Sequence, residues 1–224
     1  MEEAINSELG SNPVPEASYG GSFSHGWEIM KKHFLELLVV IFLQILLSLP
    51  FMMARAFTED YSFGYSFFTL LSIAYALLVM APVSYGSKWV FLRAVRGESF
   101  KAYEIFYAFQ NLGNIIIANL LVIAIIGVGM VLLIVPGIIF ACKLVFVPYL
   151  VTDQKMDAFD AIKKSWDMTK GFGWTIFGMG VMSFFIALAG LICLVIGIFP
   201  AAIWISSAFA TLYWTVSLKQ SPVQ

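Results

Sequence analysis

Six long apolar blocks, almost free of charged residues, constrain this chain more than any other feature. Each block is too long for a strand and lacks strict alternation of apolar and polar residues, which indicates a helix. A helix that crosses a bilayer needs roughly 20 apolar residues and satisfies its own backbone hydrogen bonds. We therefore predict an all-α polytopic membrane helix bundle with about six transmembrane helices. The blocks are Phe34–Ala54, Phe67–Ser87, Gly113–Val135, Gly137–Val151, Trp174–Ile196 and Ala201–Leu218.

The charges support this assignment. Only 12% of the 224 residues are charged, against about 25% in a typical soluble domain. Of the 13 Lys and Arg residues, Arg55 lies at one set of block ends, Lys143 lies inside the fourth block, and the other 11 lie at the opposite ends. Cytoplasmic loops carry an excess of basic residues, so we expect both termini in the cytoplasm of a bacterial cell, with the chain in the inner membrane. The 11 are Lys31, Lys32, Lys88, Arg93, Arg96, Lys101, Lys155, Lys163, Lys164, Lys170 and Lys219.

The fourth block leaves two topologies open. It has about 15 residues, or about 22 Å of helix, which is short for a full crossing. The turns at Pro136 and Pro200 carry no charge. A hairpin that crosses the membrane twice and one that enters and leaves on the same side give the same charge distribution, so the basic residues fit both.

The two ends of the chain read as tails. Residues 1–22 are rich in Ser, Pro, Gly and Glu, a composition typical of disorder. The first thirty residues hold no Lys or Arg, so we expect no cleaved signal peptide, which needs a basic start. We predict one transmembrane helical domain over residues 23–219 and a C-terminal tail over residues 220–224.

A short aromatic–acidic–apolar pattern recurs before the first, third and fifth blocks. It begins at Trp27, at Tyr103 and at Trp166. We interpret it as a threefold internal repeat, in which a short amphipathic interfacial helix precedes each of three helical hairpins, with these aromatic residues as interfacial anchors. In the third copy we expect Asp157 to cap the helix and to be followed by an apolar face of Phe159, Ile162 and Trp166. Contact with lipid headgroups and packing on the protein's own bundle both remain open for that face.

One stretch resembles a known family. Val135-Pro136-Gly137 leads into Phe146-Val147-Pro148-Tyr149, and then into Lys164-Ser165-Trp166-Asp167-Met168-Thr169-Lys170-Gly171. Over about residues 130–185 the chain resembles the membrane domain of glycerophosphoryl diester phosphodiesterases and related uncharacterised bacterial integral membrane proteins. The resemblance implies a membrane fold. It also implies that any catalysis lies in a separate soluble domain, so we expect no catalytic residue here.

Lys143 is the leading candidate for a functional polar group, because a cation inside a span is costly. It either faces the bundle interior, where it contacts carbonyl groups or an anionic ligand, or extends toward the headgroups as a structural residue. Asn119 is the second candidate for an intramembrane polar site. The stripe of Ala202, Ser206 and Ala210 predicts close approach of a neighbouring helix or a dimer contact.

The remaining residues suggest no chemistry. His25 and His33 lack partners at metal-ligand spacing, and Cys142 and Cys193 lie in apolar segments, where a thiol behaves as a small hydrophobe. We expect no metal, no cofactor and, from the net charge of -1, no nucleic-acid partner. The predicted function is a non-enzymatic membrane scaffold or accessory subunit that contacts lipid headgroups, with lipids, a second copy or another membrane protein as partner. The alternative is a small transporter or lipid-handling protein with a polar path near Lys143.

Overall fold

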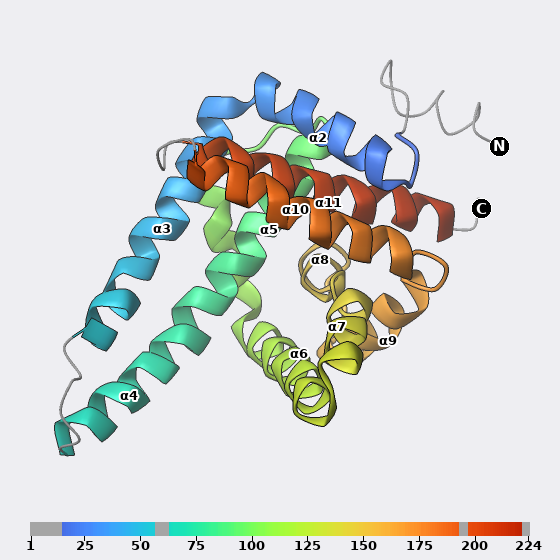
Figure 1. Ribbon diagram of the computed structural model, residues 1–224. Coiled ribbons are helices and arrows are strands. Elements are labelled where there is room, and N and C mark those ends of the chain that lie inside the picture. Colours follow the sequence, from blue (N-terminus) through green and yellow to red (C-terminus); the bar gives the residue numbers. More distant parts are fainter. Residues whose placement is uncertain (1–14, 57–62, 193–196, 221–224) are drawn as a thin grey trace.

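All regular secondary structure in the described part of the chain is helical. The computed structural model describes residues 15–56, 63–192 and 197–220, and side chains there except at 51–68. The helices, shown in Figure 1, are α2 (Tyr19–Lys32), α3 (Phe34–Ala56), α4 (Phe63–Tyr75), the π-helical turn η1 (Ala76–Met80), α5 (Ala81–Val95), the 3-10 helix η2 (Ala102–Asn111), α6 (Leu112–Leu132), α7 (Ile134–Lys143), α8 (Val147–Asp153), α9 (Ala158–Met168), α10 (Gly173–Ile192) and α11 (Ile198–Gln220).

This is a multi-pass membrane protein, as predicted. Within the described residues, five helical stretches are long and apolar enough to cross a bilayer, and a sixth is added if α2 and α3, bent by 95° from each other, form one broken span. The predicted all-α polytopic bundle is therefore confirmed. The five stretches are Thr69–Val95, Ala102–Leu132, Ile134–Asp153, Gly173–Ile192 and Ile198–Gln220.

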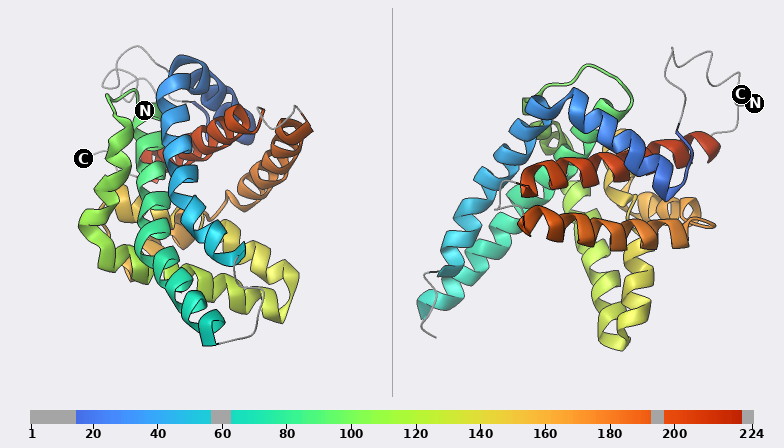
Figure 2. Two further views of the ribbon diagram at one scale, coloured as in Figure 1. Left: turned by 90° about the vertical axis from the view of Figure 1, so that its left-hand side faces the viewer. Right: turned by 45° about the horizontal axis from the view of Figure 1, so that its top comes forward.

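The helices form three hairpins: α3 with α4, η1 and α5; α6 with α7 and α8; and α10 with α11. A short helix precedes each hairpin, namely α2, η2 and α9. In Figure 2 the α3–α4 and α6–α7 arms extend in different directions from a common base, while α10 and α11 cross above them. The predicted turn near Asp60 lies outside the described residues, and the repeat in the sequence remains a prediction.

The fourth crossing is longer than the sequence suggested. Helix α7 begins at Ile134, three residues before the predicted start, and α7 and α8 together give a stretch of 20 residues. Pro136 is accepted because it lies in the first turn of α7, where the missing N–H has no intrahelical partner to lose. The expected block of about 15 residues from Gly137 was too short because we treated Pro136 as a helix boundary.

Helix α2 packs on the bundle along α11 (Figure 1). It starts at Tyr19, inside the predicted disordered tail, because Ser18 caps it and accepts a hydrogen bond from the amide of Gly21 at 3.1 Å. A Cβ added at Gly26 would lie 2.8 Å from the backbone nitrogen of Ala208, so only glycine allows this approach. The tail boundary at residue 22 was therefore wrong by four residues.

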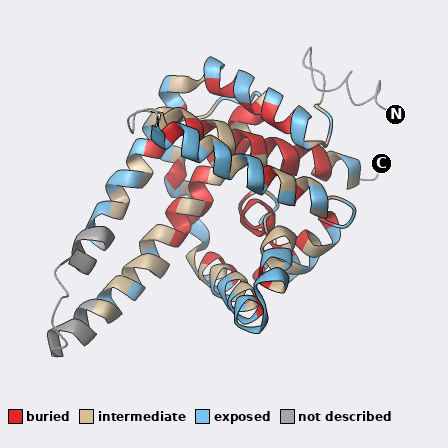
Figure 3. Cartoon of the chain, in the orientation of Figure 1, coloured by how far each residue is buried: buried red, intermediate tan, exposed pale blue. Residues whose placement is uncertain are grey.

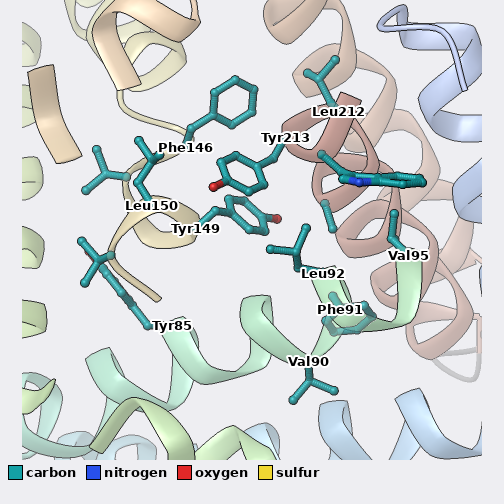
Figure 4. Close-up of a cluster of buried hydrophobic side chains, with 14 of the residues drawn as sticks. Tyr85, Val90, Phe91, Leu92, Val95, Phe146, Tyr149, Leu150, Leu212 and Tyr213 are labelled. Carbon is teal, nitrogen blue, oxygen red and sulfur yellow. The ribbon is translucent and has the colours of Figure 1, made fainter. Parts of the chain in front are cut away.

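The core lies at the base of the hairpins, where α5, α8 and α11, the returning helix of each, meet (Figure 3). The ring of Tyr213 stacks on that of Tyr149 with centroids 4.9 Å apart, and the edge contact with Phe146 is 5.6 Å. Figure 4 shows these rings beside Leu92 and Leu150. The arms are different: Val131, near the end of α6, is 88% exposed. Apolar side chains exposed in this way are compatible only with a lipid environment or a partner.

Helix η2 is held against α5 at one glycine. A Cβ added at Gly86 would overlap the carbonyl oxygen of Ile105, and Ile105 itself is completely buried. Since any side chain at position 86 would push η2 away from α5, this contact depends on glycine.

Candidate functional site

Lys143 ends α7 and lies beside α9. Its Nζ is 6.0 Å from the centroid of the Trp166 ring, and its carbonyl oxygen accepts a hydrogen bond from Ser165 Oγ at 2.8 Å. The ring of Phe140 packs on the same tryptophan with centroids 5.7 Å apart. Within the described part of the chain, Lys143 forms no ion pair with a carboxylate. An aromatic face and a helix C-terminus therefore fix the position of this cation.

A groove of about 550 Å³ lies between α7 and α10 and includes Lys143. This volume is within the roughly 300–1,000 Å³ of ordinary ligand pockets. Apart from Lys143, the side chains that line the groove are uncharged and almost all apolar. The lining residues are Val135, Ile138, Ile139, Cys142, Lys143, Gly173, Trp174 and Phe177.

Asn119 is half-buried on α6 and does not line this groove. A polar path that joins it to Lys143 remains a prediction. The asparagine that does connect helices is Asn114, whose Nδ2 donates to the carbonyl oxygen of Met156 and whose Oδ1 accepts from the amide of Ala158, both at 2.7 Å. Asn114 thus caps α9. The start of α9 is where we expected it, but the Asp157 side chain makes no capping hydrogen bond, and the first amide of the helix, that of Ala158, donates to a residue from another helix.

A polar network joins the three returning helices at the core. Arg96, which ends α5, binds Asp153 at the end of α8 through two hydrogen bonds of 2.6 and 2.7 Å. The hydroxyl of Tyr213 on α11 donates to Asp153 Oδ2 at 2.9 Å and accepts from Gln154 Nε2 at 3.3 Å. Burial opposes the charge on Arg96, but the hydrogen bonds and charge of Asp153 outweigh it and raise the pKa of the guanidinium.

Sequence reasoning missed this network. Arg96 counted only as one of the basic residues expected at the cytoplasmic ends, and Asp153 was not singled out. Nothing in the spacing of two residues 57 positions apart signals that they meet. The carboxylate of Asp153 accepts hydrogen bonds from an arginine on one helix and a tyrosine hydroxyl on another, so the network holds the three helices together.

The three predicted interfacial anchors occupy different environments. Trp27 is 42% exposed and packs edge-on against Trp204, with ring centroids 4.8 Å apart. Tyr103 is 63% exposed, and Lys101 Nζ lies 5.7 Å from its ring centroid. Trp166 is half-buried beneath Lys143. Of the three, Tyr103 is therefore the most open to the surroundings.

The predicted small-residue stripe lies on α11, with Ala210 fully buried and Ala202 and Ser206 half-buried. Ala201 and Ala208, which are not part of the stripe, make the close approaches to Gly190 and Gly26. Helix contact at small residues thus occurs on this helix, one to two positions away from those predicted.

A second, smaller hollow of about 230 Å³ lies between η2, α6 and α8 and has a more polar lining, which includes Tyr107, Asn111 and Lys155. Lys155 Nζ is 5.9 Å from the Tyr107 ring centroid.

In the described residues, no three His, Cys, Asp or Glu side chains come close enough to hold a metal ion. Cys142 is a free, half-buried thiol, and Cys193 lies outside the described residues.

Comparisons with protein-family models, with curated proteins and with solved structures give no match to this chain.

Proposed function

We propose that this chain is a non-enzymatic protein of the bacterial inner membrane, with both ends in the cytoplasm, that contacts lipid headgroups and acts as a scaffold or accessory subunit. The resemblance to the membrane domain of glycerophosphoryl diester phosphodiesterases, along the motif from Val135 to Gly171, belongs to the same proposal. The observation that carries it is the apolar face that α9 leaves uncovered.

Helix α9 packs on the bundle through three small residues and one methionine. Its buried positions are Ala158, Ala161, Ser165 and Met168. The aromatic Phe159 is 60% exposed, although burying a phenylalanine side chain stabilises a protein by about 1.5–3 kcal/mol.

A charged residue lies next to the uncovered apolar face. Ile162 and Trp166 are half-buried, and Lys163 next to them is exposed. A helix with an apolar face flanked by lysines is suited to the boundary between headgroups and acyl chains. Ile162 and Trp166 also pack partly on the bundle, so Phe159 is the apolar side chain of this face that is free for lipid.

Helix η2 has the same division. It buries Ile105 and Ala108 against α5 and α6, and leaves Tyr103 63% and Phe106 44% exposed. Two short helices that precede different hairpins therefore both expose aromatic side chains. Because this exposure recurs, it supports contact with a membrane surface and not a local irregularity of one helix.

Spin labels on α9 test this proposal. A label at Phe159→Cys should be accessible to oxygen, which concentrates in lipid, and shielded from a water-soluble nickel complex. A label at the exposed neighbour Asp160→Cys should show the reverse and serves as the matched control. The measurement is power-saturation electron paramagnetic resonance in liposomes. If the label at position 159 is as accessible to nickel as the one at 160, α9 faces water and the proposal is refuted.

Lipid handling is the second candidate, and the groove beside Lys143 favours it. A scaffold needs only to contact headgroups, whereas a lipid-handling protein must also move phospholipid between leaflets or membranes. Transfer of a fluorescent phospholipid by the reconstituted protein, lost on Lys143→Gln, would favour the second candidate. Normal headgroup contact without such transfer would favour the scaffold.

A further inference from the structure

We infer that the groove between α7 and α10 binds one acyl chain of an anionic phospholipid, with the phosphate at Lys143. This inference rests on the proposed function only in placing the protein in a bilayer, and it does not depend on what α9 contacts.

The walls of the groove select an acyl chain. Ile138 and Ile139 on α7 are exposed, Phe177 on α10 is 40% exposed, and Trp174 is 87% exposed. These side chains surround about 550 Å³ between two helices that contact each other only sparsely. Water in such a groove would find almost no hydrogen-bond partner, so a hydrocarbon is the occupant that the lining fits.

The cation selects the headgroup. Lys143 is the charged member of the lining, and its ammonium group has three N–H donors. In the described part of the chain these donors have no carboxylate partner, and the face of Trp166 supplies no hydrogen-bond acceptor lone pair. A phosphate oxygen supplies both the negative charge and the acceptors that this ammonium group lacks.

Apolar and cationic features meet at the start of α10. Gly173 and Trp174 lie three and four positions after Lys170 in the sequence and line the same groove as Lys143. Basic residues and tryptophan mark the headgroup level of a membrane. A phospholipid with its phosphate beside Lys143 and one chain along α7 satisfies both parts of the groove, whereas a soluble anion would leave the apolar part empty.

Native mass spectrometry of the whole protein tests this inference. The purified chain is mixed with equal amounts of phosphatidylglycerol, which is anionic, and phosphatidylethanolamine, which is zwitterionic, and the retained lipids are counted. We expect one phosphatidylglycerol to be retained in preference. Lys143→Gln should lower retention of phosphatidylglycerol about tenfold, since a hydrogen bond to a charged group is worth about that factor. It should also abolish the preference, because the ammonium group of phosphatidylethanolamine is repelled by Lys143 and not by a neutral glutamine.

Two further variants make the result specific. Lys32→Gln removes an exposed lysine of α2 that does not line the groove, and it should retain phosphatidylglycerol as the wild type does. Ile139→Trp narrows the groove and should weaken retention of both lipids while Lys143 stays in place. Equal retention of the two lipids by the wild type, an unchanged preference in Lys143→Gln, the same loss in Lys32→Gln, or full retention in Ile139→Trp would each overturn the inference. None of these outcomes bears on the exposure of Phe159, so the two proposals fail separately.

Discussion

Replacement of Asp153 by leucine should destabilise this protein strongly, because it disrupts the network that joins α5, α8 and α11. The substitution leaves the guanidinium of Arg96 without the carboxylate to which it donates two hydrogen bonds of 2.6 and 2.7 Å. It also removes the acceptor of the Tyr213 hydroxyl, 2.9 Å away. Both losses occur where the three returning helices meet.

The magnitude follows from burial. Removing one partner of a buried ion pair costs about 3–5 kcal/mol. The Arg96 side chain keeps 22% of its exposure and that of Asp153 keeps 10%, so water compensates part of the loss and we expect a value of about 3 kcal/mol. Tyr213→Phe removes the hydrogen bond to the charged Asp153 and the longer one from Gln154, and it should cost about 1.5–3 kcal/mol.

A double-mutant cycle separates the pair from its surroundings. Arg96→Met combined with Asp153→Leu removes both charges together and should recover most of the loss, since an apolar pair of similar volume is often as stable as a buried ion pair. The assay is unfolding of the protein in mixed micelles by increasing fractions of sodium dodecyl sulfate, followed by tryptophan fluorescence. The matched control is Asp167→Asn, which breaks the Lys170–Asp167 pair of 2.6 Å at two exposed positions and should leave the transition unchanged.

The reasoning is refuted if the double variant is as unstable as Asp153→Leu alone. Additive losses would mean that the two residues act independently, and the bidentate contact would then contribute nothing of its own.

Three other perturbations have defined outcomes. Gly86→Ala should lower the unfolding transition sharply because a Cβ overlaps the backbone of η2, whereas Gly127→Ala, with open space around its Cβ, should leave it unchanged or raise it slightly. Asn114→Ala should cost about 1 kcal/mol and speed amide hydrogen exchange at the start of α9, an effect that Asp157→Ala should not reproduce. Trp204→Phe should cost about 1 kcal/mol and increase exchange along α2, because it removes a 2.8 Å hydrogen bond to the backbone of that helix; unchanged exchange there would contradict this role.

Hydropathy predicted the helices well because each apolar block is determined by its own composition. Helix α6, for example, ends within three residues of the end predicted for the third block. The predictions that failed concern contacts between residues that lie far apart in the sequence. Asp157 has the right type and position for a cap, yet its side chain makes no capping hydrogen bond, and Asn114, 44 residues before Ala158, accepts from the first amide of the helix.

The residues of the candidate site likewise include some that the sequence identified and some that it did not. Lys143 was recognisable because a cation is conspicuous in an apolar block. Its neighbours were not, since Trp166 and Trp174 reach it only through the placement of α9 and α10. Arg96 and Asp153 look in the sequence like many other surface charges, and only the meeting of α5 and α8 makes them a pair.

The packing of α2 along α11 has a consequence for biogenesis. These are the first and last helices that the structure describes, and Trp204 donates a hydrogen bond to the carbonyl oxygen of Phe23 across 181 positions. A nascent chain therefore leaves the membrane insertion machinery with Phe23 and Gly26 uncovered until α11 has been synthesised. Packing of α2 therefore waits for the synthesis of α11, and a chain interrupted after α10 would carry an open surface on α2 for quality-control proteases to recognise.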